Sequence, residues 1–242
     1  MSNLLYKFKV ISLCLLLVFP AGLRAENQDK ELVVLLHGIA RSSKHMAKLE
    51  GYLQDRGYVV LNVDYPSTDF ELDYLADFIY GKVKGEIEGN SKVHFVGYSM
   101  GGLLVRVILE KYRFDNLGKV VQLASPNHGS EVADFFQNNW LFKSFYGPAG
   151  QQLITNQGDI KDLFGEIYYE LGVVAGNNTI DPVSSFIIKG DDDGKVSIES
   201  TKIVGMKDHV VVGASHIFFP KDKDVHKQVL CFLKAGKFCH KR

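Results

Sequence analysis

Short apolar runs alternate with amphipathic helical patterns along most of the chain, and this alternation limits the possible folds more than any other feature. Most runs are continuously apolar, which is typical of parallel strands covered on both faces. Six strands are predicted, at 32–36, 58–63, 92–97, 119–124, 185–189 and 209–212. Helical stripes lie between them, at 46–53, 72–87, 104–108 and 225–233. The order predicts an open, mostly parallel α/β sheet with right-handed crossovers and helices on both faces.

The composition excludes several other classes of protein. The chain has 242 residues, of which 46% are hydrophobic and 23% charged, with 28 basic and 28 acidic side chains. A disordered polymer and a cysteine-dense miniprotein are therefore excluded. The balanced charge offers no basic surface for a nucleic acid, so no nucleic-acid partner is expected. No histidine or cysteine spacing resembles a metal site, and neither a metal nor another cofactor is expected.

The first 25 residues differ from the rest of the chain. Lys7 and Lys9 precede an uncharged apolar stretch over 10–23, too short to span a bilayer, and small residues follow. This pattern predicts a signal peptide over 1–25, cleaved after Ala25 or Gly22. We therefore expect a secreted or periplasmic protein whose folded part is 26–242; a retained membrane anchor is the alternative. The oligomeric state is not indicated, and a monomer is assumed.

Two cysteines remain after such a cleavage. Cys231 and Cys239 would pair in an oxidising compartment and tie the C-terminal tail to the preceding helix. Two free thiols are the alternative.

The segment Gly97-Tyr98-Ser99-Met100-Gly101 is the strongest local motif. A predicted strand runs directly into it and a predicted helix follows, which is the setting of a nucleophile elbow. The alternative is a glycine-rich turn with an incidental serine. Since the order in an elbow architecture is serine, acid, histidine, the partners are sought downstream.

Three consecutive aspartates, 191–193, follow the predicted strand at 185–189, and one of them is expected to be the acid. Asp64 is a weaker rival. His216, in a loop before the last helix, is chosen as the base, and His209 is its competitor. The amides of Met100, directly after the serine, and Ile39, after the first strand, are the candidate donors of an oxyanion hole.

Taken together, five segments resemble the α/β-hydrolase superfamily, and within it small secreted bacterial lipases and esterases. They are LVVLLHGI, HFVGYSMGGLLVR, LASPNHGSEVAD, GDDDGKVSIES and GASHIF. The resemblance implies a three-layer fold with a minimal sheet of about six strands, in which the first two strands of the full superfamily sheet have no counterpart. It also implies Ser99 as nucleophile, Asp193 as acid and His216 as base, while leaving Asp191 and Asp192 open.

The interval 126–181 is too long for an ordinary connection and is rich in aromatic residues, which suggests an inserted helical cap. Trp140 and Phe142 in it are predicted to bind the acyl part of a substrate; packing against the core is the alternative.

The expected reaction is hydrolysis of acyl or lipid esters through an acyl-serine, with transient contact to a lipid interface. Thioesterase, amidase or acyltransferase activity is the alternative within the fold. A non-catalytic binding protein is the alternative outside it.

Overall fold

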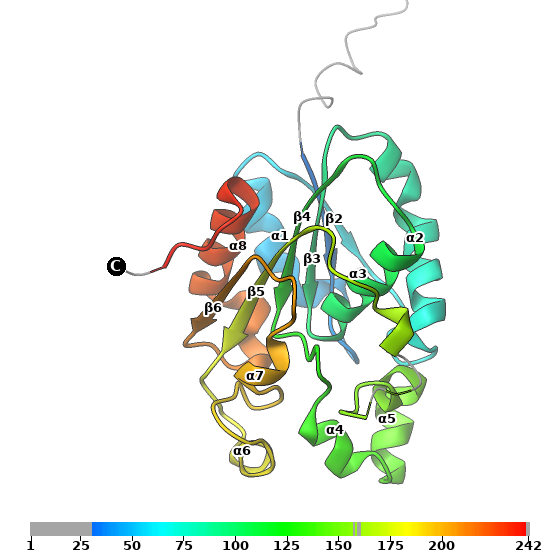
Figure 1. Ribbon diagram of the computed structural model, residues 1–242, viewed down its shortest axis with the longest axis vertical. Helices are drawn as coiled ribbons and strands as arrows, with labels where there is room; N and C mark the ends of the chain where they lie inside the picture. The colour runs from blue at the N-terminus through cyan, green and yellow to red at the C-terminus, as the bar shows by residue number, and fades with distance from the viewer. Residues whose placement is uncertain (1–30, 157, 159–160, 241–242) are drawn as a thin grey trace, which may run out of the picture.

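The six strands form one sheet in which every neighbouring pair is parallel. The computed structural model describes residues 31–156, 158 and 161–240, so the predicted signal peptide lies outside the described residues. The sheet has the order β2-β1-β3-β4-β5-β6 (Figure 1). Its strands are β1 Leu32–Leu36, β2 Val59–Val63, β3 Val93–Tyr98, β4 Leu117–Leu123, β5 Glu170–Gly176 and β6 Asp208–Val212. The prediction of an open parallel α/β sheet is confirmed.

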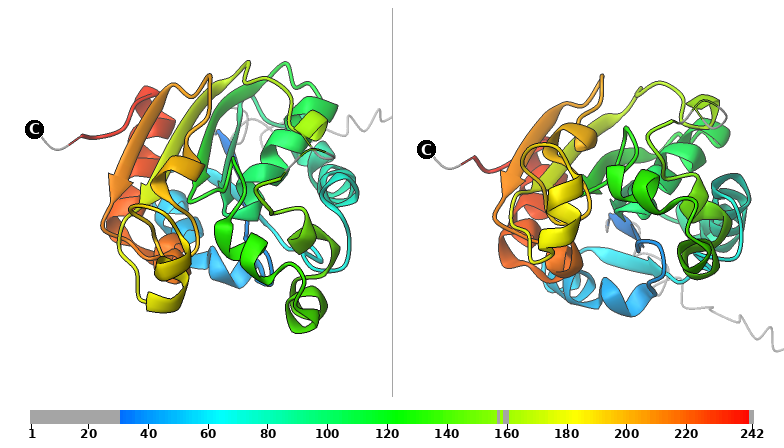
Figure 2. Two further views of the ribbon diagram at one scale, coloured as in Figure 1. Left: turned by 60° about the horizontal axis from the view of Figure 1, so that its bottom comes forward. Right: turned by 90° about the horizontal axis from the view of Figure 1, so that it is seen from below.

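Helices cover both faces of this sheet (Figure 2). α1 Ala47–Gln54 and α8 Lys223–Ala235 pack on one face, while α2 Leu72–Glu88 and α3 Met100–Lys111 pack on the other. Side chains of β1 alternate between the two faces, as a fully buried strand requires. Val33 and Leu35 join the α1–α8 core, whereas Val34 and Leu36 join the α2–α3 core.

The remaining elements are short or lie near the carboxyl ends of the strands. They are α4 Glu131–Phe136, α5 Trp140–Gln151, α6 Pro182–Ile187, α7 Ile198–Thr201 and the 3₁₀ helices η2 Ser43–His45, η3 Lys161–Leu163 and η4 His216–Lys221. α5 is interrupted at Gly147, whose φ of 61° is not helical. No helix in the described ranges is long and apolar enough to cross a membrane.

The predicted strand at 185–189 is wrong. Most of that segment belongs to α6, which starts at a helix-initiation signal that the strand interpretation overlooked. Asp181 caps the helix by accepting a hydrogen bond from the Ser184 amide at 3.1 Å, and Pro182 occupies the first turn. The fifth strand is β5 instead. The interval 126–181 therefore contains α4, α5 and a strand of the sheet, and its role as a cap stays a prediction.

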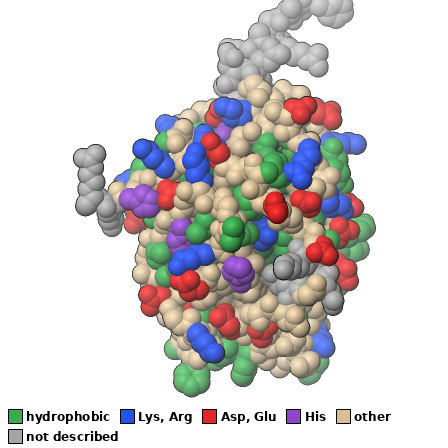
Figure 3. All heavy atoms as spheres, in the orientation of Figure 1, with side chains coloured by type: hydrophobic (Ala, Val, Ile, Leu, Met, Phe, Trp, Pro, Cys, Tyr) green, Lys and Arg blue, Asp and Glu red, His purple; other side chains and the backbone are tan. Residues whose placement is uncertain are grey.

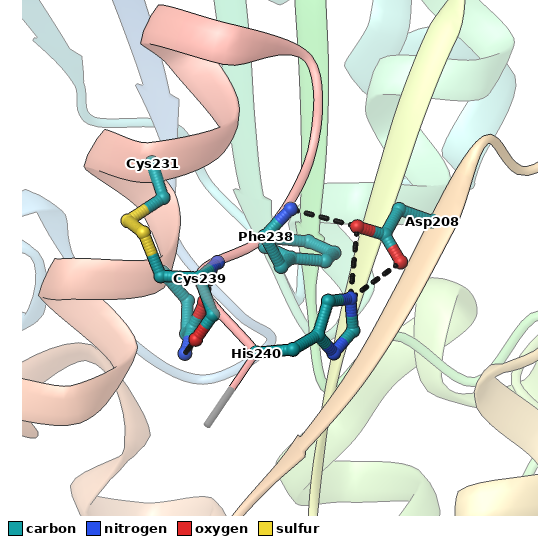
Figure 4. Close-up of a disulfide and its surroundings, with 6 residues drawn as sticks. Asp208, Cys231, Phe238, Cys239 and His240 are labelled. Atoms are coloured by element: carbon teal, nitrogen blue, oxygen red, sulfur yellow. Dashed lines mark hydrogen bonds and ion pairs between the residues drawn. A yellow bond between two sulfur atoms is a disulfide. The ribbon is translucent and has the colours of Figure 1, made fainter. Parts of the chain in front are cut away.

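The C-terminal tail folds back along α8. Cys231 and Cys239 form a disulfide with their Cα atoms 5.8 Å apart, so the paired alternative is confirmed (Figure 4). The Phe238 amide donates to Asp208 Oδ2 at 2.7 Å, at the start of β6. His240 also contacts this carboxylate, at 3.1 Å. These contacts fasten the tail to the edge strand.

Candidate active site

Ser99 lies in the sharp turn between β3 and α3. Its φ of 54° and ψ of −123° are strained for a residue with a side chain. Glycines allow the strand and the helix to approach so closely. A Cβ at Gly97 would come within 2.5 Å of the Gly101 backbone, and a Cβ at Gly101 within 2.4 Å of the Leu36 carbonyl oxygen. The predicted strand-turn-helix setting of the motif is present.

Ser99, His216 and Asp193 form a continuous path of hydrogen-bond contacts. Ser99 Oγ lies 3.1 Å from His216 Nε2, and His216 Nδ1 lies 2.7 Å from Asp193 Oδ2. With the proton of the neutral imidazole on Nδ1, that nitrogen donates to Asp193 and Nε2 accepts from the serine hydroxyl. The three residues follow β3, α6 and β6, and meet at one edge of the sheet.

Asp193 is held so that one carboxylate oxygen faces the histidine. Its other oxygen, Oδ1, accepts hydrogen bonds from the amides of Lys195 and Val196 at 3.0 and 2.9 Å. The His216 amide donates to the Asp193 carbonyl at 2.8 Å, which ties the two loops together. The side chain is almost fully buried. These contacts fix both the position and the orientation of the carboxylate.

The rival acids have other partners. Asp192 Oδ1 accepts from Ser185 Oγ at 2.7 Å and from the Gly194 amide at 2.6 Å, which stabilises the turn. Asp191 is exposed. Asp64 Oδ1 accepts from the Ser43 amide at 2.8 Å. Of the four acids considered from the sequence, Asp193 is the one in contact with His216.

The rival base also has another partner. His209 Nε2 lies 3.1 Å from Thr201 Oγ1, and burial lowers the pKa of its imidazole. The lowered pKa favours the neutral ring of this residue, which lies within β6.

Tyr98 supports the histidine, a contact that the sequence reasoning missed. Its hydroxyl donates to the His216 carbonyl at 2.7 Å, and the two ring centroids lie 5.2 Å apart. Burial raises the pKa of this phenol, so it remains a protonated donor. The position of Tyr98 next to Ser99 was the available signal, but its contact to a residue 118 positions away is not visible in the sequence.

The two predicted oxyanion donors belong to segments that flank Ser99. Met100 is the first residue of α3, so its amide is one of those left free at a helix N-terminus. Ile39 follows β1 and lines the cavity beside Ser99. The loop around Ile39 is held by Tyr65, whose ring stacks on His37 with centroids 4.0 Å apart and whose hydroxyl donates to the His37 carbonyl. Burial lowers the pKa of His37, which favours a neutral ring.

A cavity of about 240 Å³ opens at Ser99. Its apolar wall comes from Ile39, Val132, Ala133, Phe142, Tyr146 and Leu153, and Arg41 and Lys195 add positive charge. Phe142 lines the cavity, whereas Trp140 is 73% exposed and does not; a role of either in binding the acyl chain stays a prediction. In the described ranges, no group of three or more His, Cys, Asp or Glu side chains is arranged to hold a metal ion.

Comparison with known proteins identifies the class of this chain. The model of the α/β hydrolase fold matches residues 31–164, more than half of the sequence, and the chain belongs to this family. A fully parallel six-stranded sheet with a strained serine turn after β3 agrees with that assignment.

The individual matches include thioesterases, which match in sequence, and lipases, which match in structure. Lysosomal thioesterase PPT2 of Mus musculus is 27% identical over 151 residues, which cover 56% of this chain and 50% of that protein. The chain thus spans about half the length of the lysosomal thioesterases that it matches. Among solved structures, the mature Bacillus licheniformis lipase BlEst2 matches with a TM-score of 0.70 at 21% identity, over 86% of this chain and 92% of that one. Phospholipase PlaB of Legionella pneumophila matches with a TM-score of 0.63 at 19% identity, over 77% and 53%. At identities of 21% and 19%, these structural matches show a shared fold and nothing beyond it.

Proposed function

We propose that residues 26–242 form a serine hydrolase that cleaves carboxylic esters of acyl chains. The observation that carries the proposal is the path from Ser99 through His216 to Asp193 at the wall of an apolar cavity. A serine hydroxyl becomes a competent nucleophile only when a base accepts its proton, and His216 is within reach to do so. The apolar wall suits an acyl chain, because burying apolar surface is favourable.

The reaction proceeds in two halves. Ser99 Oγ attacks the carbonyl carbon as its proton passes to His216 Nε2, and Asp193 stabilises the imidazolium. The amides of Ile39 and Met100 hold the developing oxyanion. Collapse breaks the bond to the alcohol, which takes the proton from His216 and leaves an acyl-serine. Water, deprotonated by His216, then releases the acid and restores Ser99.

Hydrolysis of p-nitrophenyl esters from acetyl to palmitoyl tests this proposal. We expect Ser99→Ala and His216→Ala to lower kcat by about 10⁴-fold or more. Asp193→Asn should lower it by roughly 10²–10⁴-fold, because the imidazole loses its orienting acceptor. Asp191→Asn, a matched change in the exposed neighbour, should retain the activity. A folded wild type that is inert on every ester, or full activity in Ser99→Ala, would refute the proposal.

Thioester hydrolysis is the second candidate, because the chain is similar in sequence to lysosomal thioesterase PPT2. Butyrylcholine and butyrylthiocholine form a matched pair that differs in one atom at the scissile bond. A kcat/KM at least tenfold higher for the thioester would favour this candidate, and the reverse ratio would favour the oxygen ester. Labelling of Ser99 by a fluorophosphonate without turnover of either would support an amidase or acyltransferase instead. No labelling at all would support a non-catalytic binding protein.

We further propose that residues 1–25 are a signal peptide and that the protein acts in the periplasm or outside the cell. The charge pattern of the N-terminus supports this. The Cys231–Cys239 disulfide supports it too, because disulfides persist mainly in oxidising compartments. The mass of the exported protein tests the proposal: it should correspond to a start at residue 23 or 26, and a full-length mass would contradict it.

A further inference from the structure

Residues 126–130, which we call the PNHGS segment after their sequence, have no role in the proposed reaction but contact several parts of the site. The first and last residues of the segment line the cavity beside Ser99. In Figure 1, the chain that leaves β4 passes beside α7 on its way to α4. α7 directly follows residues 191–197, which we call the acid turn because they include Asp193.

Asn127 lies at the centre of the contacts of this segment, and both polar atoms of its side-chain amide are paired. Its Oδ1 accepts a hydrogen bond from Arg106 Nη1 at 3.1 Å. Its Nδ2 donates to Gln122 Oε1 at 2.7 Å and to the Thr201 carbonyl at 2.8 Å. Gln122 Nε2 in turn donates to the Gly102 carbonyl at 2.9 Å. One buried amide thus connects the first two turns of α3 with the last residue of α7.

Arg106, the partner of Asn127 on α3, is a buried cation. The basic side chains that Figure 3 shows lie on the surface, interspersed with acidic ones. Arg106 is only 6% exposed, and burial lowers its pKa to about 10, so the side chain still carries its charge at neutral pH. Its guanidinium lies over the Phe164 ring, 4.5 Å from the centroid. In the part of the chain that the structure describes, Nη1 donates to Asn127 and the buried Nε has no hydrogen-bond partner. Since burying a charge costs free energy, packing alone does not account for this pair.

Three further hydrogen bonds join the PNHGS segment to the acid turn and to α7. The His128 amide donates to the Ser200 carbonyl at 3.2 Å, and Ser200 Oγ donates to the Gly129 carbonyl. Ser130 Oγ donates to the Lys195 carbonyl at 2.8 Å. The amide of Lys195 itself donates to the carboxylate of the acid. The segment therefore holds both the acid turn and the helix that follows it.

We propose that the PNHGS segment fixes the position of the acid turn relative to α3, and that Asn127 is a positioning residue for the reaction. β4 lies between β3, which ends at the serine turn, and β5, whose end packs against the acid turn. The inference rests on the proposed function, because it assumes that Ser99 and Asp193 act together through His216. A displacement of about 1 Å in a reacting group lowers a rate by roughly 10²-fold. A paired polar network favours one arrangement and so limits such displacement.

Asn127→Ala removes the central contacts, and two measurements report its effect. One gives kcat and KM for a soluble acetyl ester. The other gives the rate at which a fluorophosphonate phosphonylates Ser99 with loss of fluoride, which depends on the alignment of the site and not on the preferred acyl group. We expect kcat and the labelling rate to fall by about 10- to 100-fold with KM nearly unchanged, because alignment is lost while the cavity wall remains.

Asn116→Ala is the matched control. Asn116 Nδ2 also donates to two acceptors, the carbonyls of Ile87 and Asn90 at 2.8 and 2.7 Å. Asn116 directly precedes β4, at the opposite edge of the sheet from the site. Asn116→Ala should therefore lower the melting temperature, as Asn127→Ala does, but leave kcat and the labelling rate unchanged.

A double-mutant cycle separates positioning from a general loss of stability. If Asn127 acts through Asp193, then Asn127→Ala should cost no more than about a further threefold in the Asp193→Asn background, where the histidine already lacks its acceptor. Ser200→Ala removes a single donor of the same network and is the milder variant. It should slow labelling about threefold, as expected for one hydrogen bond, and should show the same loss of effect in that background.

The outcomes distinguish this inference from the proposed function. Labelling that slows in Asn127→Ala, in a protein that hydrolyses no ester, would support the positioning role and remove the esterase. Ester hydrolysis with an unchanged labelling rate in Asn127→Ala would overturn the positioning role alone. Additive losses in the double mutant, equal losses in Asn116→Ala, or a rise in KM at constant kcat would also overturn it. Should Asn127→Ala fail to fold, Ser200→Ala decides, and an unchanged labelling rate there would overturn the inference.

Discussion

Tyr65 acts on the candidate oxyanion loop through the backbone of His37. Its hydroxyl donates to the His37 carbonyl, and its ring covers the imidazole. Ala40 directly follows Ile39 and has a φ of 53°. Its amide donates to Ser67 Oγ at 3.1 Å. Tyr65 and Ser67 thus hold the loop on both sides of Ile39. A donor held in advance stabilises an oxyanion more than one that must reorganise.

Tyr65→Phe removes that hydrogen bond and keeps the ring. We expect kcat for soluble esters to fall about tenfold with KM nearly unchanged, because the Ile39 amide is less well held in the transition state. Tyr112→Phe is the matched control, since Tyr112 also donates to one acceptor, Asp77, but on the distant α2–α3 surface. A rise in KM at constant kcat would assign Tyr65 to substrate binding, and equal effects in both variants would indicate a general loss of stability.

At the scale of elements, α5 has one side that lines the cavity and another that faces solvent. Phe142 lines the cavity and contacts Tyr146, with ring centroids 4.7 Å apart. Its neighbours Trp140 and Leu141 point to solvent. The sequence interpretation treated Trp140 and Phe142 alike, because both are aromatic and lie in the same interval. Which of two residues faces a cavity depends on where the helix starts, and Asn139 sets that start by capping α5.

Phe142→Ala tests the role of the inner side of α5. We expect the ratio of kcat/KM for octanoyl over acetyl esters to fall about tenfold, because the longer chain loses an apolar wall that the shorter chain does not reach. Leu141→Ala, in the adjacent exposed position, should leave the ratio unchanged. If Phe142→Ala reduces turnover of both esters equally, Phe142 supports the fold of the site instead of contacting the acyl chain.

Local patterns predicted the elements that carry the motif, but not those that depend on distant contacts. The strands at β1, β2, β3, β4 and β6 and the helices α1, α2, α3 and α8 follow from apolar periodicity alone. β5 was missed because its segment contains two glycines and the apolar SFII segment further on has stronger strand propensity. The contact of Tyr65 with His37 follows from the register of β1 and β2, in which Leu36 pairs with Val63. No local pattern encodes such a register.

On the scale of the whole molecule, the parallel sheet brings the site residues together, and buried histidines couple the stability of the fold to pH. Ser99 and His216, 117 positions apart, follow strands that end at the same edge of the sheet. Asp193 reaches this edge from the loop after α6, next to Gly176 at the end of β5. Five other histidines, His37, His45, His94, His209 and His226, have pKa values lowered chiefly by burial. Protonating them costs folding free energy, so the stability of the fold is coupled to pH.

His45, beside Tyr98, shows this coupling most strongly. Burial, and then the charges of Arg41 and Lys221, lower its pKa to about 4. Within the described part of the chain, its buried Nε2 has no hydrogen-bond partner. The unfolded chain, with a pKa of about 6.5, binds this proton first. The contribution to stability is therefore complete above pH 6.5 and is lost progressively as the pH falls toward 4, at up to about 1.4 kcal/mol per pH unit for one proton.

We expect the free energy of unfolding, measured by urea titration at pH 7.5, 6.5, 5.5 and 5.0, to fall below pH 6.5. His45→Gln should make the free energy of unfolding depend less steeply on pH, by up to the equivalent of one bound proton, because glutamine does not titrate. Asn138→Gln, a change at an exposed side chain that does not titrate, should leave the dependence of the free energy of unfolding on pH as it is. An unchanged slope in His45→Gln would mean that this ring takes up its proton as easily in the folded state as in the unfolded one. The acid sensitivity would then come from the remaining buried histidines.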